Sequence, residues 1–412
     1  MNIGIFLGYA VCASLAFPSA AADAPQISVA CDRASHRYRI EEAAEFLVET
    51  PQPGVEVEVK FCRVAEEPLE SVVTTTPARV SFSLGKPGFI RCWARRRDGE
   101  VGGKASVGVA FEPERLRPSL PPPDDYDRFW ADAFRELESI PADYTKRRIA
   151  AGVYAVSCNT ANGKKQYGFL RLPEGTGPYP LKVQVYGGEA YIAEESALSG
   201  GTPVDSAHLL IHLPPYEPVA KGQDAKARHT AWLKEHGLNR FVFENIDKEP
   251  RDLYFYPCIL GGCRLIDFAA KEPSVDRARI YCYGASHGGG FAVYFTAFSP
   301  HVRAAFCGVP NFGNLSGPVE GRPIGVTSGP WWKVWRKLRY FDAAYCARRI
   351  SVPVFMSVGF VDDLVAPDSV YTIYNELRGP KFMFDKVNYG HGGSPPEYRH
   401  VCRAWIEHVL DR

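Results

Sequence analysis

The sequence lacks an excess of charge of either sign. Its 48 Lys and Arg residues are balanced by 47 Asp and Glu residues, which leaves a formal net charge of +1 over 412 residues. Proteins that bind nucleic acid or anionic membrane surfaces usually carry clustered positive charge. The composition therefore indicates neither of these partners, and we predict no nucleic acid ligand.

Long apolar runs, internal repeats and low-complexity tracts are absent after residue 22. No later stretch is apolar for long enough to span a bilayer, so we predict no membrane span. Residues 1–22 contain no charged side chain, and an apolar run over residues 3–17 is followed by small residues ending at Ala22. This pattern predicts a signal peptide, although the usual Lys or Arg before the run is missing. We therefore expect a secreted or periplasmic protein.

The sequence contains 11 cysteines, and cleavage after Ala22 would remove Cys12. The even number that remains in an exported chain permits disulfides but does not specify their pairing. Cys282 and Cys307 fall in apparent core strands, where a buried free thiol is the simpler interpretation.

Residues 23–114 show short alternating segments separated by turn residues, clearest over 55–61, 78–84 and 89–94. Alternation with period two over about 90 residues predicts a small immunoglobulin-like β-sandwich domain. We favour a scaffolding role for it over carbohydrate binding, because no set of sugar-stacking aromatics is evident. The proline-rich segment 117–123 predicts an extended linker at the domain boundary.

Residues 115–412 alternate between strand-like and helix-like segments. A helix capped by Asp124 or Asp125 opens this region, and longer helices are expected over 252–270 and 397–409. Strands are expected over 150–156, 166–172, 181–186, 209–212, 241–243, 279–283, 304–308, 354–358 and 382–387. Hairpin-like strands followed by βα repeats predict an α/β fold, an α/β-hydrolase with a mostly parallel sheet covered by helices.

Residues 284–288 read Gly-Ala-Ser-His-Gly, between a predicted strand and an apolar helix. This matches G-x-S-x-G, the nucleophile elbow, in which a strained turn exposes the hydroxyl of the central serine. Small flanking residues allow the strand and the helix to cross closely. An ordinary turn fits the same five residues equally well, so the motifs that follow must decide.

Acyl transfer by serine needs a base for the hydroxyl proton and an acid that orients the base, and in this fold they follow in the order Ser, Asp, His. A buried strand over 354–358 leads to Asp362 and Asp363, of which only one can face the histidine. We favour Asp362. His391 follows the last strand in a glycine-flanked loop. The sequence thus predicts Ser286 as nucleophile, His391 as base and Asp362 as orienting acid.

Two N–H groups are expected to form an oxyanion hole. The backbone N–H of His287, directly after the nucleophile, is one candidate, and the loop after strand 181–186 offers Gly187 or Gly188 as the other. A plain glycine turn is the alternative interpretation of this pair.

Three aromatic residues, Trp331, Trp332 and Trp335, lie between predicted strands and could stack on sugar rings. Packing in a lid or in the core is the simpler interpretation, and we favour it. His208 and His212 share one face of a strand, but nothing in the sequence completes a metal site. We predict no metal and no cofactor.

Several motifs that occur in one order along the chain identify a protein family more specifically than G-x-S-x-G alone. They are 120–130 (LPPPDDYDRFW), 284–290 (GASHGGG), 300–305 (PHVRAA), 340–344 (YFDAA), 353–362 (PVFMSVGFVD) and 389–391 (YGH). From about Arg115 to the C-terminus, the chain resembles the acetyl xylan esterase and cephalosporin C deacetylase family of α/β-hydrolases.

The resemblance implies removal of acetyl groups from xylan or short xylo-oligosaccharides, with Ser286, Asp362 and His391 as the triad. It also implies an acetylated plant polysaccharide as substrate, and homo-oligomers, since the family often forms hexameric rings. Two features depart from the family pattern. His287 stands where Gln is usual, and residues 186–189 read Tyr-Gly-Gly-Glu in place of His-Gly-Tyr.

Two other functions are compatible with the sequence. An esterase for feruloyl, methyl or other short acyl esters would use the same three side chains. A non-catalytic polysaccharide-binding protein that kept the hydrolase fold is the alternative from a different class, and the complete set of triad residues argues against it.

Overall fold

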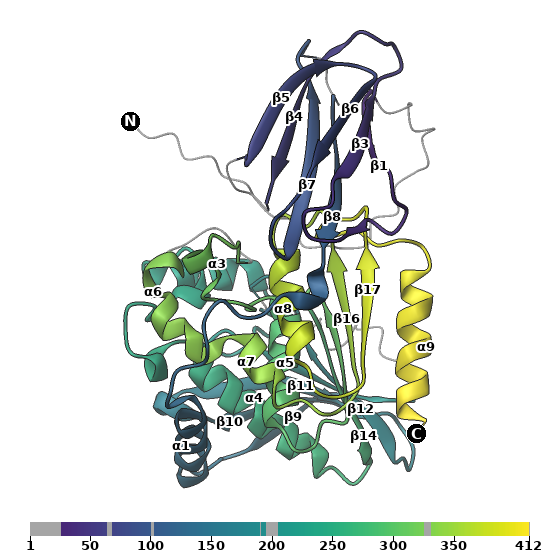
Figure 1. The fold of residues 1–412 in the computed structure, drawn as a ribbon. Coiled ribbons are helices and arrows are strands. Elements are labelled where there is room, and N and C mark those ends of the chain that lie inside the picture. Colours follow the sequence, from purple (N-terminus) through teal and green to yellow (C-terminus); the bar gives the residue numbers. More distant parts are fainter. Residues whose placement is uncertain are drawn as a thin grey trace.

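The computed structural model describes residues 26–63, 68–99, 103–189, 191–194, 205–324 and 331–411, except the side chains of 331–333. An all-β region lies above a larger α/β region in Figure 1. The predicted signal peptide lies outside the described residues. Within the described part of the chain, every helix is too short or too polar to cross a bilayer.

The all-β region consists of two sheets. One holds β1 (Ser28–Cys31), β3 (Ala44–Glu49) and β6 (Ala78–Phe82), and the other holds β2 (Arg37–Tyr38), β8 (Lys104–Phe111), β7 (Gly88–Arg96), β4 (Glu56–Cys62) and β5 (Glu70–Thr75), in these spatial orders. In β4, every second side chain is buried, which is the period of a strand with one face in a core. The three segments that the sequence predicted here are β4, β6 and β7.

The α/β region is built on one sheet of nine strands. Its spatial order is β17 (Lys381–Lys386), β16 (Val354–Gly359), β15 (Ala304–Gly308), β14 (Val275–Ala285), β12 (Tyr179–Val185), β13 (Ala207–His212), β11 (Lys165–Arg171), β10 (Val153–Asn159) and β9 (Thr145–Ala150). The strands from β17 to β13 are parallel, and β11, β10 and β9 are antiparallel. This confirms the predicted α/β-hydrolase arrangement.

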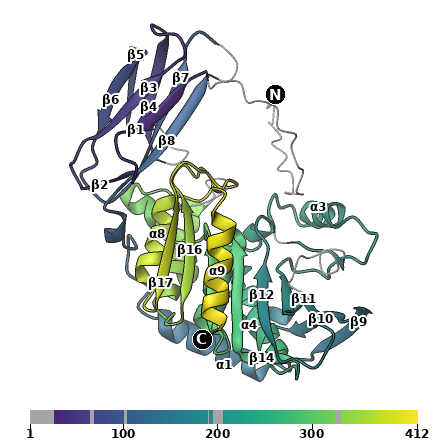
Figure 2. The same ribbon diagram turned by 90° about the vertical axis from the view of Figure 1, so that its right-hand side faces the viewer.

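Helices cover both faces of this sheet (Figures 1 and 2). The α-helices are α1 (Tyr126–Ser139), α3 (Ala225–Glu235), α4 (Phe255–Ala270), α5 (His287–Phe298), α6 (Trp331–Leu338), α7 (Ala343–Ala347), α8 (Pro367–Glu376) and α9 (Tyr398–Leu410). Short 3₁₀ turns are η1 (Pro113–Arg115), η2 (Ala161–Gly163), η3 (Phe241–Phe243), η4 (Pro250–Asp252), η5 (Gly317–Glu320) and η6 (Arg339–Phe341). In Figure 1, α9 lies on one face of the sheet, and α4, α5 and α8 lie on the other.

Two local predictions were wrong. Phe241–Phe243 is a buried 3₁₀ turn and not a strand, because a short apolar run marks burial without specifying the backbone conformation. The segment predicted as one strand over 150–156 is divided by a turn at Gly152, whose φ of 65° ends β9 before β10 begins.

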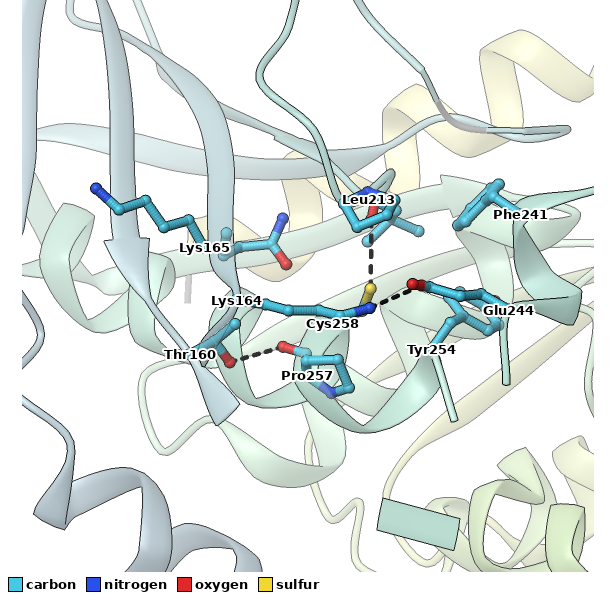
Figure 3. Close-up of a pocket in the computed structure, with 11 residues that line it drawn as sticks. Thr160, Lys164, Lys165, Leu213, Phe241, Glu244, Tyr254, Pro257 and Cys258 are labelled. Atoms are coloured by element: carbon cyan, nitrogen blue, oxygen red, sulfur yellow. Dashed lines mark hydrogen bonds and ion pairs between the residues drawn. The ribbon is translucent and has the colours of Figure 1, made fainter. Parts of the chain in front are cut away.

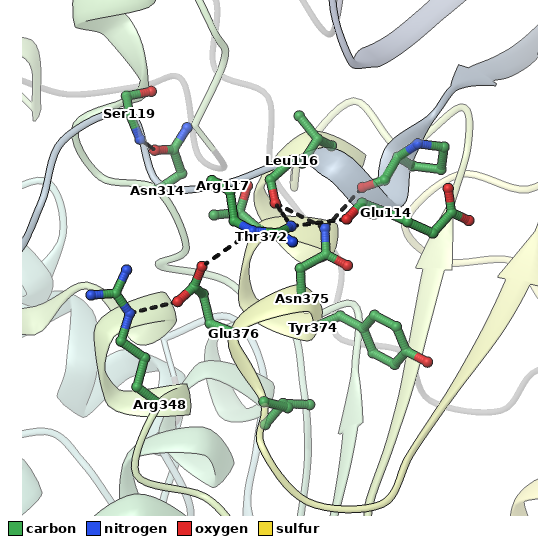
Figure 4. Close-up of polar contacts among 12 residues, drawn as sticks. Glu114, Leu116, Arg117, Ser119, Asn314, Arg348, Thr372, Tyr374, Asn375 and Glu376 are labelled. Carbon is green, nitrogen blue, oxygen red and sulfur yellow. Dashed lines mark hydrogen bonds and ion pairs between the residues drawn. The ribbon is translucent and has the colours of Figure 1, made fainter. Parts of the chain in front are cut away.

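The predicted linker and the residues just before it are packed against the α/β region (Figure 4). The side-chain amide of Asn375 in α8 donates to the carbonyl oxygens of Pro113 and Leu116, each at 2.9 Å. The backbone N–H of Ser119 donates to Asn314 Oδ1 at 2.8 Å. These hydrogen bonds fix the connection between the two regions.

The ten cysteines among the described residues are free thiols. Cys282 in β14 and Cys307 in β15 are fully buried, as the sequence suggested. Burial raises the pKa of Cys282 to about 12, because a thiolate is poorly solvated in the core. These thiols therefore behave as small apolar side chains.

Candidate active site

Ser286 occupies the turn between β14 and α5. Its backbone has φ 57° and ψ −122°, a strained conformation for a residue with a side chain. The turn also needs glycine on both sides. A Cβ atom at Gly284 would lie 2.2 Å from the carbonyl oxygen of Gly288, and one at Gly288 would lie 2.1 Å from that of Val185. The residues thus form the tight, strained turn that the G-x-S-x-G pattern predicted.

Asp362 and His391 are hydrogen-bonded to each other. His391 Nδ1 lies 2.9 Å from Asp362 Oδ2, and the Asp362 side chain is completely buried. The other oxygen, Oδ1, accepts the backbone N–H groups of Leu364 and Val365, each at 2.9 Å. The neighbouring Asp363 is exposed. Of the two adjacent carboxylates, Asp362 is therefore the one that contacts the histidine.

Ser286, Asp362 and His391 lie beyond the carboxyl ends of β14, β16 and β17. Because β14, β15, β16 and β17 are parallel neighbours, these ends share one edge of the sheet. Among the hydrogen bonds of the described residues, none joins the Ser286 hydroxyl to His391. Nucleophile–base hydrogen bonds are often long in unliganded enzymes and tighten with substrate.

The predicted oxyanion residues lie around the same turn. Gly187 follows β12, next to β14 in the sheet, and a Cβ atom there would lie 3.5 Å from the Cβ atom of Ser286. Gly188 has open space around it and a φ of 64°. His287 is the first residue of α5, where a backbone N–H has no acceptor within the helix. The strand order reverses between β12 and β14, because β13 lies on the far side of β12 and β15 on the far side of β14. In α/β proteins, ligands commonly bind at such a point.

The His287 side chain is buried and points into the protein. Its Nε2 atom shares a hydrogen bond with the Tyr254 hydroxyl at 3.0 Å, and its ring stacks on Phe291 at a centroid distance of 5.3 Å. Burial lowers the pKa of His287 to about 3, because the charged imidazolium would lose its hydration. The ring is therefore neutral and packs in the core.

A partly buried polar cluster, which the sequence did not reveal, holds the loop after β12. Glu189 Oε1 lies 2.6 Å from Arg240 Nε, and Glu189 Oε2 lies 3.6 Å from His229 Nε2. His229 Nδ1 in turn hydrogen-bonds the Tyr216 hydroxyl at 2.7 Å. Burial alone would raise the pKa of Glu189, but His229 and Arg240 outweigh it and lower the pKa to about 2. We name Glu189, Arg240, His229 and Tyr216 the Glu189 cluster.

The tryptophan prediction concerns α6. Trp335 is half-buried, with the guanidinium carbon of Arg336 4.9 Å from its ring centroid. The side chains of Trp331 and Trp332 lie outside the described part of the chain.

A small pocket, drawn in Figure 3, is lined by Phe241 and Tyr254, which both contact His287. Its charged pair is Lys164 and Glu244, 2.7 Å apart. None of the predicted triad, oxyanion or tryptophan residues lines it. This pocket is therefore not the substrate-binding surface of the candidate site.

The two strand histidines make no metal site with their described neighbours. His212 Nδ1 accepts the backbone N–H of Ile192 at 3.1 Å, and burial lowers the pKa of both His208 and His212 to about 3. The described residues contain no group of three His, Cys, Asp or Glu side chains placed to hold a metal ion.

The nine-stranded sheet with the elbow after β14 defines the α/β-hydrolase class. Within it, the model of the acetyl xylan esterase (AXE1) family matches residues 112–317 and 330–407, and the chain belongs to that family. The matched residues begin at the end of the all-β region. Membership makes the chain a carboxylic ester hydrolase and confirms the resemblance seen in the sequence.

Named relatives agree with this family. The acetyl esterase Axe7A of Xylanibacter ruminicola is 25% identical over 328 residues, which cover 75% of this chain and 72% of the relative. The acetyl xylan esterase from Paenibacillus sp. R4 superimposes with a TM-score of 0.58 at 23% identity, over 72% of this chain and 98% of the other. Acetyl xylan esterase 1 from Thermoanaerobacterium sp. JW/SL YS485 gives the same TM-score and coverages at 18% identity. The two structures support the fold.

Proposed function

We propose that this protein is a serine carbohydrate esterase that removes acetyl groups from xylan or xylo-oligosaccharides through an acyl-enzyme. The observation that carries the proposal is the hydrogen bond between His391 and Asp362 at the sheet edge that also bears the strained Ser286. The family match and the names of the relatives support acetyl groups on xylan as the target.

In the proposed first step, the Ser286 hydroxyl attacks the acetyl carbonyl carbon while His391 Nε2 takes its proton. Asp362 accepts the Nδ1–H of His391 and so fixes the tautomer that leaves Nε2 free to act as base. The developing oxyanion is bound by the N–H of His287 and by an N–H from Gly187 or Gly188. When the intermediate collapses, the C–O bond to the sugar breaks, and His391 returns the proton to the departing hydroxyl.

In the second step, water attacks the acetyl-Ser286 ester. His391 takes a proton from the water and donates it to Ser286 Oγ as the ester bond breaks, which releases acetic acid and restores both the Ser286 hydroxyl and the neutral His391. No group other than water and the side chains named is needed to balance the reaction.

The cellular setting is part of the proposal. An acetylated plant polysaccharide is too large to cross a cell membrane unaided, so an exported enzyme suits this substrate. The uncharged, apolar N-terminal segment supports export through a signal peptide. The tendency of the family to form rings supports a homo-oligomer, and the all-β region is proposed to be immunoglobulin-like.

The experiment compares the parent with Ser286→Ala on a chromogenic acetyl ester and on acetylated xylan. We expect the variant to lose at least about 10⁴-fold in kcat, since removing the nucleophile disables the whole triad. Ser139→Ala, an exposed serine at the end of α1, is the matched control and should keep parental activity. A Ser286→Ala variant as active as the parent would exclude the mechanism.

The substrate class must be tested by comparing several esters, because residues 186–189 and His287, around the predicted oxyanion hole, differ from the family pattern. Rates on acetyl xylan should exceed rates on feruloyl and methyl esters. A large excess for the aryl-acid esters would assign the enzyme to that alternative while leaving the triad intact.

A further inference from the structure

The all-β region packs directly on the loop that carries Asp362. Phe360, two residues before Asp362, is 1% exposed. Its ring meets the ring of Phe89 from β7 edge to face, with 5.0 Å between the centroids. The Phe89 ring also contacts Tyr371 in α8, at 5.4 Å. A side chain of the all-β region thus sits between two parts of the α/β region.

Gly108 in β8 lies directly against the backbone of Phe360. A Cβ atom at this position would lie 2.4 Å from the carbonyl oxygen of Phe360 and 2.8 Å from its Cβ atom. Gly108 is an ordinary strand residue and is absent from the glycines with positive φ, so its backbone does not itself require glycine. His36 Nδ1 lies 2.9 Å from the Gly108 carbonyl oxygen and holds this part of β8 in place. Because Gly108 has no side chain, the loop that carries Asp362 can lie directly against β8.

Two ion pairs attach the all-β region to α8 and β17, the two elements that follow this loop. Arg37 Nη2 lies 2.6 Å from Asp385 Oδ2 in β17, the strand that leads to His391. Arg63 Nη1 lies 4.0 Å from Asp368 Oδ1 in the first turn of α8, and both side chains are almost completely buried. The segment from β16 through α8 to β17 is therefore held at three points, on both sides of Asp362.

Asp362 cannot adjust independently of its loop. Its Oδ1 atom is tied to the N–H groups of Leu364 and Val365, so a shift of the loop backbone carries the carboxylate with it. A displacement of about 1 Å is enough to reduce catalysis about 100-fold when it misplaces a reacting group.

We propose that the all-β region helps to position the catalytic acid. Gly108 and Phe89 position Phe360, and through it they hold Asp362 against His391. Both are positioning residues, since neither contacts the substrate. This inference rests on the proposed function, because it assigns the support of the acid in that triad.

The test is a double-mutant cycle on the full-length mature enzyme, with initial rates on a small chromogenic acetyl ester. Gly108→Ala places a methyl group against the Phe360 carbonyl. We expect kcat to fall about 10- to 100-fold, with KM changed less than twofold, since the ester does not touch the all-β region. In an Asp362→Asn background, which has already lost the acid, Gly108→Ala should change kcat less than twofold.

Gly85→Ala is the matched control, because Gly85 lies in the same region with nothing within 4 Å of its added Cβ atom and a φ that is not positive. It should leave kcat unchanged. Phe89→Leu is the second variant, which removes the ring edge on Phe360 and should show the same pattern at smaller size. If Gly108→Ala does not fold, the same comparison is made with Phe89→Leu alone.

The outcomes separate the inference from the proposed function. If the parent is active, Ser286→Ala is inactive, and the variants lose equally in both backgrounds, the positioning role is wrong while the function stands. Unchanged kcat in Gly108→Ala and Phe89→Leu also overturns it. If Ser286→Ala keeps parental activity, the function itself is wrong and the inference falls with it.

Discussion

The two sides of Ser286 are supported in different ways. On one side, Asp362 and His391 are joined by a hydrogen bond of 2.9 Å, and the loop that carries Asp362 packs against Phe89 and Gly108 of the all-β region. On the other side, the loop with Gly187 and Gly188 is held by the Glu189 cluster, whose four residues all belong to the α/β region. We call these the acid–base side and the oxyanion side.

The difference separates two means of preorganisation. The acid–base side relies on apolar packing and two ion pairs between regions far apart in the chain, and the close packing tolerates little change in shape. The oxyanion side relies on a charged pair whose stabilisation depends on both partners remaining ionised and desolvated. Substitutions should therefore damage the two sides in distinguishable ways.

The largest effect is expected on the acid–base side. His391→Gln removes the base and should lower kcat by about 10⁵- to 10⁶-fold, whereas Asp362→Asn should lower it by about 10⁴-fold. Steady-state kinetics on a chromogenic acetyl ester measure both. Asp363→Asn is the matched control for the neighbouring carboxylate and should stay within twofold of the parent. A greater loss in Asp363→Asn than in Asp362→Asn would reassign the acid.

A smaller effect is expected on the oxyanion side. Glu189→Gln leaves Arg240 partly buried without its counter-charge, and we expect the free energy of unfolding to fall by roughly 2 kcal/mol. We also expect kcat to fall about tenfold as the glycine loop loosens. Urea unfolding and steady-state kinetics measure the two changes.

An exposed ion pair provides the control for that prediction. Arg403 and Glu407 are 2.7 Å apart on α9, and their side chains are 82% and 57% exposed. Glu407→Gln should change the free energy of unfolding by less than about 0.5 kcal/mol. Equal losses in Glu189→Gln and Glu407→Gln would show that the partly buried pair gives the loop no special support.

Low pH should lower the free energy of unfolding in part through the oxyanion side, because the neutral ring of His287 is buried there. Between about pH 3 and 6.5, the unfolded chain binds a proton at this residue and the folded chain does not. Stability contributed by His287 is thus complete above about pH 6.5 and decreases as the pH falls toward 3. Each such histidine adds at most about 1.4 kcal/mol per pH unit to the slope.

His287→Gln should remove that contribution and flatten the pH dependence of the free energy of unfolding between pH 6.5 and 5. Urea unfolding at a series of pH values measures it. His400→Gln, at an exposed position of α9, should leave the slope as in the parent. An unchanged slope in His287→Gln would contradict a buried neutral imidazole.

The smallest effect concerns α6, outside both sides. If Trp335 stacks on a sugar ring, Trp335→Ala should raise KM for acetylated xylo-oligosaccharides about fivefold, corresponding to about 1 kcal/mol. The KM for a small chromogenic acetyl ester should stay unchanged, because that substrate has no sugar to stack. Equal changes for both substrates would favour packing as the role of this side chain.

The sequence predicts those parts of the site that follow local rules. Strand ends, glycine flanks and the order Ser, Asp, His lead to the prediction of Ser286, Asp362 and His391, and of these the structure brings Asp362 and His391 into contact. It also chose correctly between two adjacent carboxylates for this contact, since Asp363 is exposed.

Contacts between distant segments left no such local signal. Glu189 and Arg240 are 51 residues apart, and Gly108 meets Phe360 only after the two regions dock. From the sequence alone, a glycine within a strand indicates only a weak tendency to form that strand. Its role becomes clear when the structure shows which backbone packs against it. The apolar run Phe241–Phe243 was misassigned because burial by distant partners, such as His287, made it resemble a core strand.

The central claim is that His391, held by Asp362, activates Ser286. Covalent labelling with a fluorophosphonate probe, followed by mass spectrometry of the digested protein, tests it most directly. The account predicts one adduct, on Ser286, and a labelling rate at least about 1000-fold lower in His391→Gln. An adduct on another serine, or equal labelling rates in the parent and His391→Gln, would contradict it.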